Sequence, residues 1–191
     1  MRNSGKHLSF LALGLIMLLS CQVWAADFDY AQFRRECGLR LAYGKSISRT
    51  DVKHYTLLPR WGFFLVSPGS WLAGLGISVV AEGAIGIAEA EDTGWEFGLT
   101  PLLKLSFPLG TKALIFIEGG AGFIWENFDS PATPHTFNFT PQVGGGVDIA
   151  LTGKLALSLA YRFRHSSNAG LYKNNPDFNV HLLQMGLIYY H

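Results

Sequence analysis

Apolar and polar residues alternate one by one along most of this chain, and no stretch beyond residue 25 shows a helical period. The alternation is clearest over 95–107 and 137–150, where odd positions are mostly aromatic or aliphatic and even positions are mostly polar or glycine. A period of two is that of a β-strand with one apolar face. The pattern predicts eight strands, over about 37–46, 54–66, 76–89, 95–107, 113–125, 137–150, 154–165 and 179–190.

These segments share one parity and are long. Each has about 10–14 residues, whereas strands of soluble proteins usually have about 5–6 and a tilted membrane strand needs about 9–11. The odd face is apolar, with aromatic residues mostly toward strand ends, as in the girdles of membrane barrels. The pattern therefore predicts an all-β fold, an eight-stranded antiparallel transmembrane β-barrel of the outer membrane. Its interior would hold nine charged residues of even parity: Arg40, Arg60, Glu82, Glu96, Lys104, Glu118, Asp148, Arg162 and Arg164.

Two other folds are alternatives to the membrane barrel. A soluble, lipocalin-like barrel would put the apolar face inside, but Trp and Phe occur on nearly every strand while the other face is rich in glycine. A single transmembrane helix over 71–90 would contain Glu82 and four glycines. Both features favour the membrane barrel.

Residues 1–25 are expected to be a secretory signal peptide, followed by the barrel domain over 26–191. Arg2 and Lys6 precede an apolar run of about 13 residues, and the run is followed by a cleavage site at 23–25. Cleavage would leave Cys37 as the one cysteine, which excludes a disulfide framework. An alternative is that Cys21, in a lipoprotein-like Leu-Leu-Ser-Cys box, carries a lipid anchor.

The charge of the mature chain gives no sign of a nucleic-acid partner. Without residues 1–25 the chain has 13 Lys and Arg against 14 Asp and Glu, a net charge of −1. The six histidines have no spacing typical of metal ligands, so neither a metal nor another cofactor is expected. The partners expected are the membrane and its lipids, and a homodimer stays open.

The barrel has an expected orientation, since barrels of this class have short periplasmic turns and longer external loops. With the N-terminus in the periplasm, the external connections are 47–53, 90–94, 126–136 and 166–178, and three of these are long. The periplasmic connections are 67–71, 108–111 and 151–153, and residues 26–36 would form a short periplasmic tail.

Candidate chemistry lies at the outer end of the seventh strand, in Arg-His-Ser-Ser-Asn-Ala-Gly over 164–170. His165 has the parity of the apolar, lipid-facing residues, and Ser167 shares that face because residues two apart in a strand point the same way. Ser166 would point inward or into the loop. A histidine that accepts a serine proton makes that serine nucleophilic enough to attack an ester.

Other residues nearby would complete such a site. Asn168 and backbone N–H groups around Ala169 and Gly170 could stabilise an oxyanion. Asn179, of the same parity on the last strand, could orient His165 as the third member of a triad. The ordinary alternative is a solvent-exposed loop whose Ser and Asn side chains form turns.

The motif resembles that of the PagL family of outer-membrane lipid A 3-O-deacylases. The resemblance rests on His165 to Leu171, on Asn175-Pro176 and on the Leu-Leu-Gln-Met-Gly-Leu-Ile-Tyr-Tyr of the last strand. It implies an eight-stranded barrel that hydrolyses the ester-linked acyl chain at position 3 of lipid A without a metal. By the same resemblance His165 would be the general base, Ser167 the nucleophile, and Asn168, Gly170 and Asn175 the support of the oxyanion.

The chain departs from the family pattern in two places. Ser166 replaces a bulky residue, and Asn179 stands where the family has a glutamate that orients the histidine. Asp177 has the same parity as Asn179, so either residue could take that role. An Asp-to-Asn change at this role costs serine proteases about 10⁴ in kcat, which predicts a slow enzyme if Asn179 is the third member.

The sequence is also compatible with two other functions. The chain could be a non-enzymatic structural or adhesive barrel, in which His165 and Ser167 have no chemical role. It could also be a phospholipase that uses the same two residues on another lipid.

Overall fold

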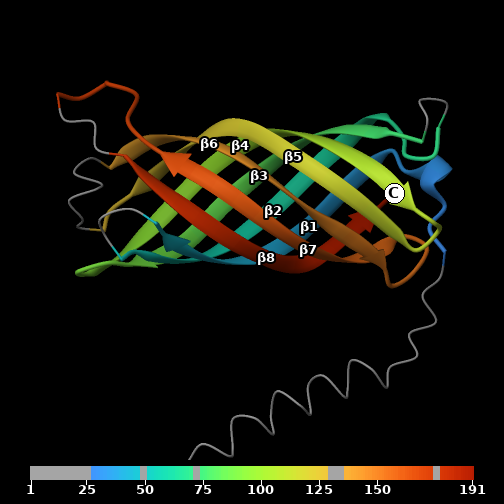
Figure 1. The fold of residues 1–191 in the computed structure, drawn as a ribbon, viewed down its shortest axis with the longest axis horizontal. Coiled ribbons are helices and arrows are strands. Elements are labelled where there is room, and N and C mark those ends of the chain that lie inside the picture. Colours follow the sequence, from blue (N-terminus) through green and yellow to red (C-terminus); the bar gives the residue numbers. More distant parts are fainter. Residues whose placement is uncertain (1–26, 48–50, 71–73, 129–135, 174–176) are drawn as a thin grey trace, which may run out of the picture.

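The computed structural model describes residues 27–47, 51–70, 74–128, 136–173 and 177–191. They form a closed antiparallel barrel in which each strand pairs with the next and the last pairs with the first (Figure 1). A short 3₁₀ helix, η1, precedes the strands. The elements are η1 Tyr30–Gln32, β1 Arg35–Ser46, β2 Lys53–Val66, β3 Gly76–Glu89, β4 Thr93–Leu109, β5 Ala113–Glu126, β6 Phe137–Ala150, β7 Leu155–Ser166 and β8 Phe178–Tyr190.

All eight predicted strands are present, and no boundary differs from the prediction by more than two residues. The alternative of a membrane helix over 71–90 is wrong, because β3 occupies most of that range. No helix in the part of the chain that the structure describes is long and apolar enough to cross a membrane. The predicted signal peptide, 1–25, and with it Cys21, lies outside the described residues.

The interior of the barrel is charged, as the parity predicted. Among the described residues the buried charged side chains are five cations and six anions. The anions exceed the predicted four because Glu36 and Glu126 lie just outside the predicted strand ranges. Arg60 links three strands, with contacts of 3.1 Å to Glu36, 2.9 Å to Glu82 and 2.8 Å to Glu118. Near balance of charge matters here, since an unpaired buried charge costs several kcal/mol.

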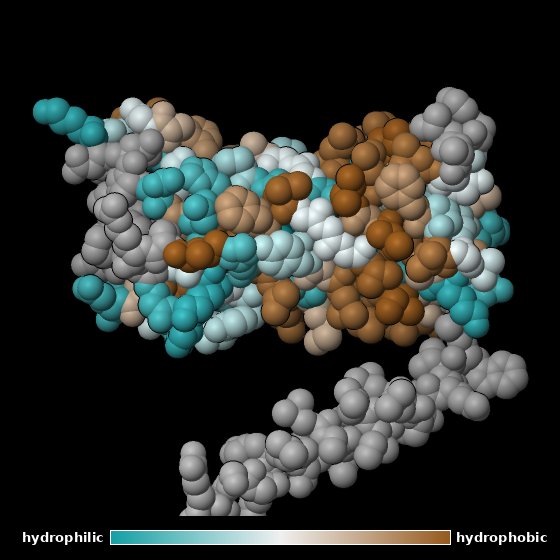
Figure 2. Space-filling model, viewed as in Figure 1, coloured by the Kyte–Doolittle hydropathy of each residue, from teal (hydrophilic) through white to brown (hydrophobic). Residues whose placement is uncertain are grey.

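The outer surface is apolar, which makes the soluble, lipocalin-like alternative wrong. Figure 2 shows hydrophobic residues gathered over the middle of the barrel and toward the end with the C-terminus, with hydrophilic residues at both ends. Tyr43, Tyr55 and Trp95 are exposed near one end of their strands, and Trp61 and Tyr189 toward the other. Aromatic side chains at both ends of an apolar band are typical of a barrel in a bilayer.

The residues before β1 do not form the predicted tail. Phe33 is 1% exposed and stacks on Tyr190 at a centroid distance of 4.5 Å, and Phe28 packs on both rings. The Tyr30 hydroxyl donates to the backbone oxygen of Ala113 at 2.8 Å. Because apolar rings cover the charged interior there, residues 27–34 close this end of the barrel.

The chain termini mark one end of the barrel. The C-terminus and η1 lie together at that end (Figure 1), and the connections 47–52, 90–92, 127–136 and 167–177 therefore lie at the opposite end. Most of these are the longer connections, although the segment between β2 and β3, on the side of the termini, covers 67–75 and exceeds the predicted 67–71. We call the end opposite the termini the outer end.

Candidate active site

His165 lies on β7 at the outer end of the barrel, directly opposite Asn179 on β8. Exposure alternates from there: His165 and Ser167 are partly exposed, whereas Ser166 and Asn168 are 1% exposed. Ser167 extends the strand pairing, because it exchanges backbone hydrogen bonds of 2.7 and 3.1 Å with Phe139 of β6. The extended backbone therefore puts the side chains of His165 and Ser167 on the lipid-facing side.

The imidazole of His165 is held by the neighbouring strand. Its Nδ1 lies 2.8 Å from Oδ1 of Asn179. An amide carbonyl oxygen can only accept a hydrogen bond, so Nδ1 carries the proton in this contact and Nε2 is the basic nitrogen. That is the tautomer that a general base for a serine requires.

The second residue expected to orient His165 approaches the same nitrogen. Asp177 Oδ2 lies 3.9 Å from Nδ1 of His165, and the Asp177 side chain is 61% exposed. This distance permits electrostatic attraction but exceeds a hydrogen bond. Asn179 thus makes the direct contact, while Asp177 places a carboxylate just beyond it.

Asn168 and Gly170 form the turn that follows β7. Oδ1 of Asn168 accepts a hydrogen bond of 2.9 Å from Gly170 N–H, and the carbonyl oxygen of Asn168 accepts one of 3.0 Å from Leu171 N–H. Ala169 and Gly170 have φ values of 52° and 82°. The buried side chain of Asn168 therefore shapes the turn and does not share the face of Ser167. Asn175, the third expected oxyanion support, lies outside the described residues.

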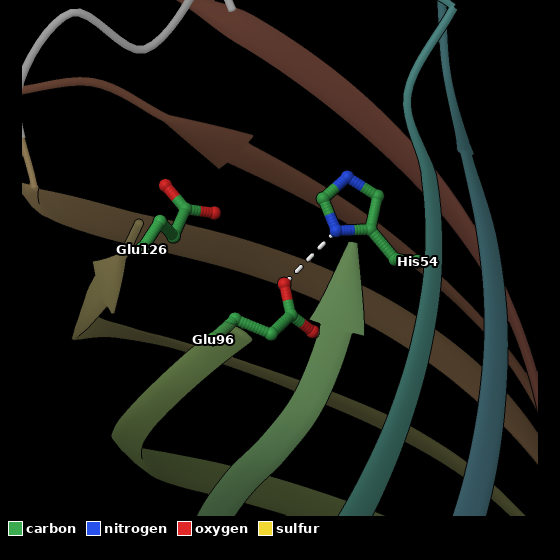
Figure 3. Close-up of side chains that lie close together, drawn as sticks. All are labelled: His54, Glu96 and Glu126. Carbon is green, nitrogen blue, oxygen red and sulfur yellow. Dashed lines mark hydrogen bonds and ion pairs between the residues drawn. The ribbon is translucent and has the colours of Figure 1, made fainter. Parts of the chain in front are cut away.

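Behind this site, inside the barrel, lies a polar cluster that sequence spacing did not indicate. His54, Glu96 and Glu126 come from β2, β4 and β5, and their nearest ligand-type atoms lie within 4.8 Å of one another (Figure 3). Nδ1 of His54 is 2.9 Å from Oε2 of Glu96. Glu96 and Glu126 are direct partners on the neighbouring strands β4 and β5. All three residues share the even, inward parity, and the proximity of His54, two strands from Glu96, depends on the strand register.

Each residue of this cluster has a protein partner, although Nε2 of His54 and Oε1 of Glu126 have none among the described residues. Arg164 Nη2 donates to Oε2 of Glu96 at 3.2 Å, and Asn138 Nδ2 donates to Oε2 of Glu126 at 3.0 Å. The His54 ring stacks on the Phe178 ring at a centroid distance of 6.0 Å. Phe178 thereby covers the cluster toward the outer end. Since Arg164 precedes His165 directly, the cluster fixes the inner side of the strand whose outer side carries the candidate base.

Comparison with known families identifies the family of the chain. The sequence model of the family described as Lipid A 3-O-deacylase (PagL) matches residues 38–187, well over half of the chain. The chain belongs to the PagL family. The match covers β2–β7 completely and most of β1 and β8. No curated protein matches the chain in sequence.

Solved structures share the fold. The crystal structure of the outer membrane enzyme PagL is similar at 19% sequence identity and a TM-score of 0.58, covering 78% of this chain and 97% of the other. Neisserial surface protein A is similar at 13% sequence identity and a TM-score of 0.56, and the match covers 84% of this chain and 97% of the other. Ail, the attachment invasion locus protein of Yersinia pestis, is similar at 13% sequence identity and a TM-score of 0.54, and the match covers 83% of this chain and 97% of the other. The solved structures support the barrel fold, and with membership of the PagL family the protein is an outer-membrane barrel.

Proposed function

We propose that this chain is a lipid A 3-O-deacylase, a serine esterase that removes the acyl chain at position 3 of lipid A in the outer leaflet. One observation carries the proposal: Asn179 holds Nδ1 of His165 at 2.8 Å, which leaves Nε2 as a base on the lipid-facing side that Ser167 shares. Membership of the PagL family supports the choice of lipid A as the substrate.

In the first half of the reaction, Ser167 Oγ attacks the ester carbonyl carbon while Nε2 of His165 takes the hydroxyl proton. The resulting oxyanion collapses, the bond between carbonyl carbon and sugar oxygen breaks, and the imidazolium returns the proton to that oxygen. The products of this half are an acyl-Ser167 ester and lipid A with a free 3-hydroxyl group.

In the second half, a water molecule replaces the sugar. Nε2 of His165 takes a proton from the water, the hydroxide attacks the acyl carbonyl, and Ser167 leaves as the alcohol with the proton returned. A free fatty acid departs. The site lies at the outer end of β7, so water from outside the cell has access to it while the acyl chains remain beside the apolar surface.

Oxyanion stabilisation would come from the turn after β7. The Gly170 N–H is already donated to Asn168 Oδ1, so we assign the donor role to the N–H of Ala169, an exposed residue held in the left-handed conformation two positions after Ser167. Asn168 acts indirectly, because its side chain holds that turn. Fixed backbone donors of this kind are among the largest contributors to acyl-transfer catalysis.

Mass spectrometry of lipid A tests the proposal. Lipid A is extracted from cells that express the chain and from cells that express a His165→Ala variant at equal level. We expect loss of one 3-hydroxyacyl chain from position 3 with the native chain only. Unchanged lipid A in both samples, together with a folded barrel, would instead identify a non-enzymatic barrel. Loss of acyl chains from glycerophospholipids would identify a phospholipase.

A further inference from the structure

A row of basic side chains crosses the outer surface beside the candidate active site. Lys45 on β1 pairs directly with Lys53 on β2, and on its other side with His181 on β8. All three have the odd, outward parity, and the lysine side chains are 57% and 44% exposed. Lys45 and Lys53 flank the connection between β1 and β2, so the row lies at the outer rim.

Without a bound anion, this arrangement of basic side chains is electrostatically unfavourable. Two like charges directly opposite each other on neighbouring strands destabilise a sheet. Each lysine has one acidic neighbour: Asp51 lies 3.1 Å from Lys45, and Glu89 lies 4.0 Å from Lys53. Exposed pairs of this kind contribute little, so a multiply charged anion can replace them. His181 contacts the hydroxyl of Tyr161 through Nδ1.

Directly below the row lies an apolar groove. It has a volume of about 750 Å³. Its outward-facing walls come from the three strands of the row and from β3, and include Leu41, Tyr43, Tyr55, Ile87 and Leu183. Tyr43 and Tyr55 pair directly across β1 and β2, two residues from Lys45 and Lys53 toward the middle of the barrel. A phosphorylated lipid has this distribution of chemistry, with an anionic head above an acyl chain.

We propose that Lys45, Lys53 and His181 bind a phosphate group of lipid A, with one of its acyl chains in the groove below. This inference rests on the proposed function for the identity of the lipid. Lys45 lies two strands from β7, level with Phe163, and His165 is two residues farther toward the outer end. The separation of Lys45 and His165 is therefore roughly 12 Å, and both side chains can reach toward the space between them. Lipid A carries phosphate and acyl groups on the same sugar, so the row sets which ester reaches Ser167.

Binding tests this inference separately from hydrolysis. The barrel carries Ser167→Ala in every sample, so that no lipid is consumed. Native mass spectrometry in detergent then compares Lys45→Gln/Lys53→Gln with Lys112→Gln/Lys154→Gln, which makes the same charge change at exposed lysines of the opposite rim. The probes are bis-phosphorylated lipid A, the same lipid after enzymatic dephosphorylation, and phosphatidylglycerol.

We expect bis-phosphorylated lipid A to bind about 10- to 30-fold more weakly to the Lys45/Lys53 variant. Each lysine near an anionic head group contributes about five-fold to the affinity, and two lysines are changed. The opposite-rim variant should change affinity by less than about two-fold. Equal loss in both variants, or equal binding of the dephosphorylated lipid, would overturn the phosphate site. Equal binding of phosphatidylglycerol would overturn lipid A as the lipid that the site binds. Because the assay needs no turnover, failure of deacylation in cells and failure of this site give different results.

Discussion

Oδ1 of Asn179 lies 2.8 Å from Nδ1 of His165, across the pairing of β7 with β8. The contact fixes the ring and its tautomer, which is the structural part of what an acid does in a serine triad. It supplies no negative charge for the imidazolium that forms when His165 takes the serine proton. The geometry of a triad is therefore present, but the electrostatic stabilisation of the imidazolium is weaker than with an acid.

The first prediction is that Asn179→Asp raises activity. A carboxylate in the same place keeps the contact with Nδ1 and stabilises the imidazolium, so kcat on lipid A should rise by at least about ten-fold. The measurement is the rate of fatty acid release by the purified barrel in mixed micelles. Asn179→Ala is the control, and it should lower kcat because the ring then loses the direct hydrogen bond that orients it. A decrease with Asn179→Asp would show that the amide is the required group.

The second prediction concerns Asp177, whose carboxylate lies 3.9 Å from the same nitrogen. In the native chain this is the carboxylate nearest to His165 among the ion pairs of the described residues, so Asp177→Asn should lower kcat. The effect should be modest, about three- to ten-fold, because the side chain is 61% exposed and solvent screens it. The same substitution in the Asn179→Asp background should have almost no effect. Equal losses in both backgrounds would mean that Asp177 acts independently of the histidine.

The third prediction separates the two adjacent serines. Ser167 shares the outward face of His165, whereas Ser166 is 1% exposed and its Oγ has no hydrogen-bond partner among the described residues. Ser167→Ala should abolish deacylation of lipid A in cells, and Ser166→Ala should leave both activity and folding near native. Mass spectrometry of lipid A and the gel mobility of unheated barrels measure the two effects. Activity that disappears with Ser166→Ala alone would assign the nucleophile to the inner face.

How far the sequence predicts this molecule depends on the range of the interactions involved. Strand alternation is local, so it predicts the positions of the strands, the inward direction of the Arg60 side chain and the outward direction of the His165 side chain. The pairing of His165 with Asn179 could also be expected, because β7 and β8 form a hairpin. The pairing of Glu96 with Glu126 follows from the β4–β5 hairpin in the same way. The approach of His54 could not be expected, since it comes from β2, two strands from Glu96, and depends on the register of both intervening pairings.

Two other features escaped the sequence for different physical reasons. Residues 27–34 have no strand pattern, yet Phe28 and Phe33 are buried because the end of the barrel exposes apolar rings that they can cover. The position of Asn168 directly after Ser167 predicts a role at the oxyanion, and the sequence does not indicate which way its side chain points. The turn after β7 places the side chain of Asn168 inward, where Oδ1 accepts a hydrogen bond from Gly170 N–H.

The fourth prediction is that the interior charge network, not the outer surface, dominates stability. Glu118 contacts Arg40, Arg60 and Arg162, with Nη1 of Arg40 at 2.6 Å from Oε1. Glu118→Gln keeps the size of the side chain but leaves three buried guanidinium groups with one anion fewer. Removing one member of a buried ion pair typically costs about 3–5 kcal/mol, so we expect a loss of that order in the free energy of unfolding in urea.

A matched surface variant makes the fourth prediction specific. Glu89 is half exposed and lies 4.0 Å from Lys53, so Glu89→Gln removes the same charge from an ion pair in contact with solvent. Its cost should stay below about 1 kcal/mol. If both variants lose equally little, the interior would have to be hydrated well enough to screen its charges. That outcome would mean that the buried arginines and carboxylates tolerate substitution, and that pairing of strands alone keeps the barrel closed.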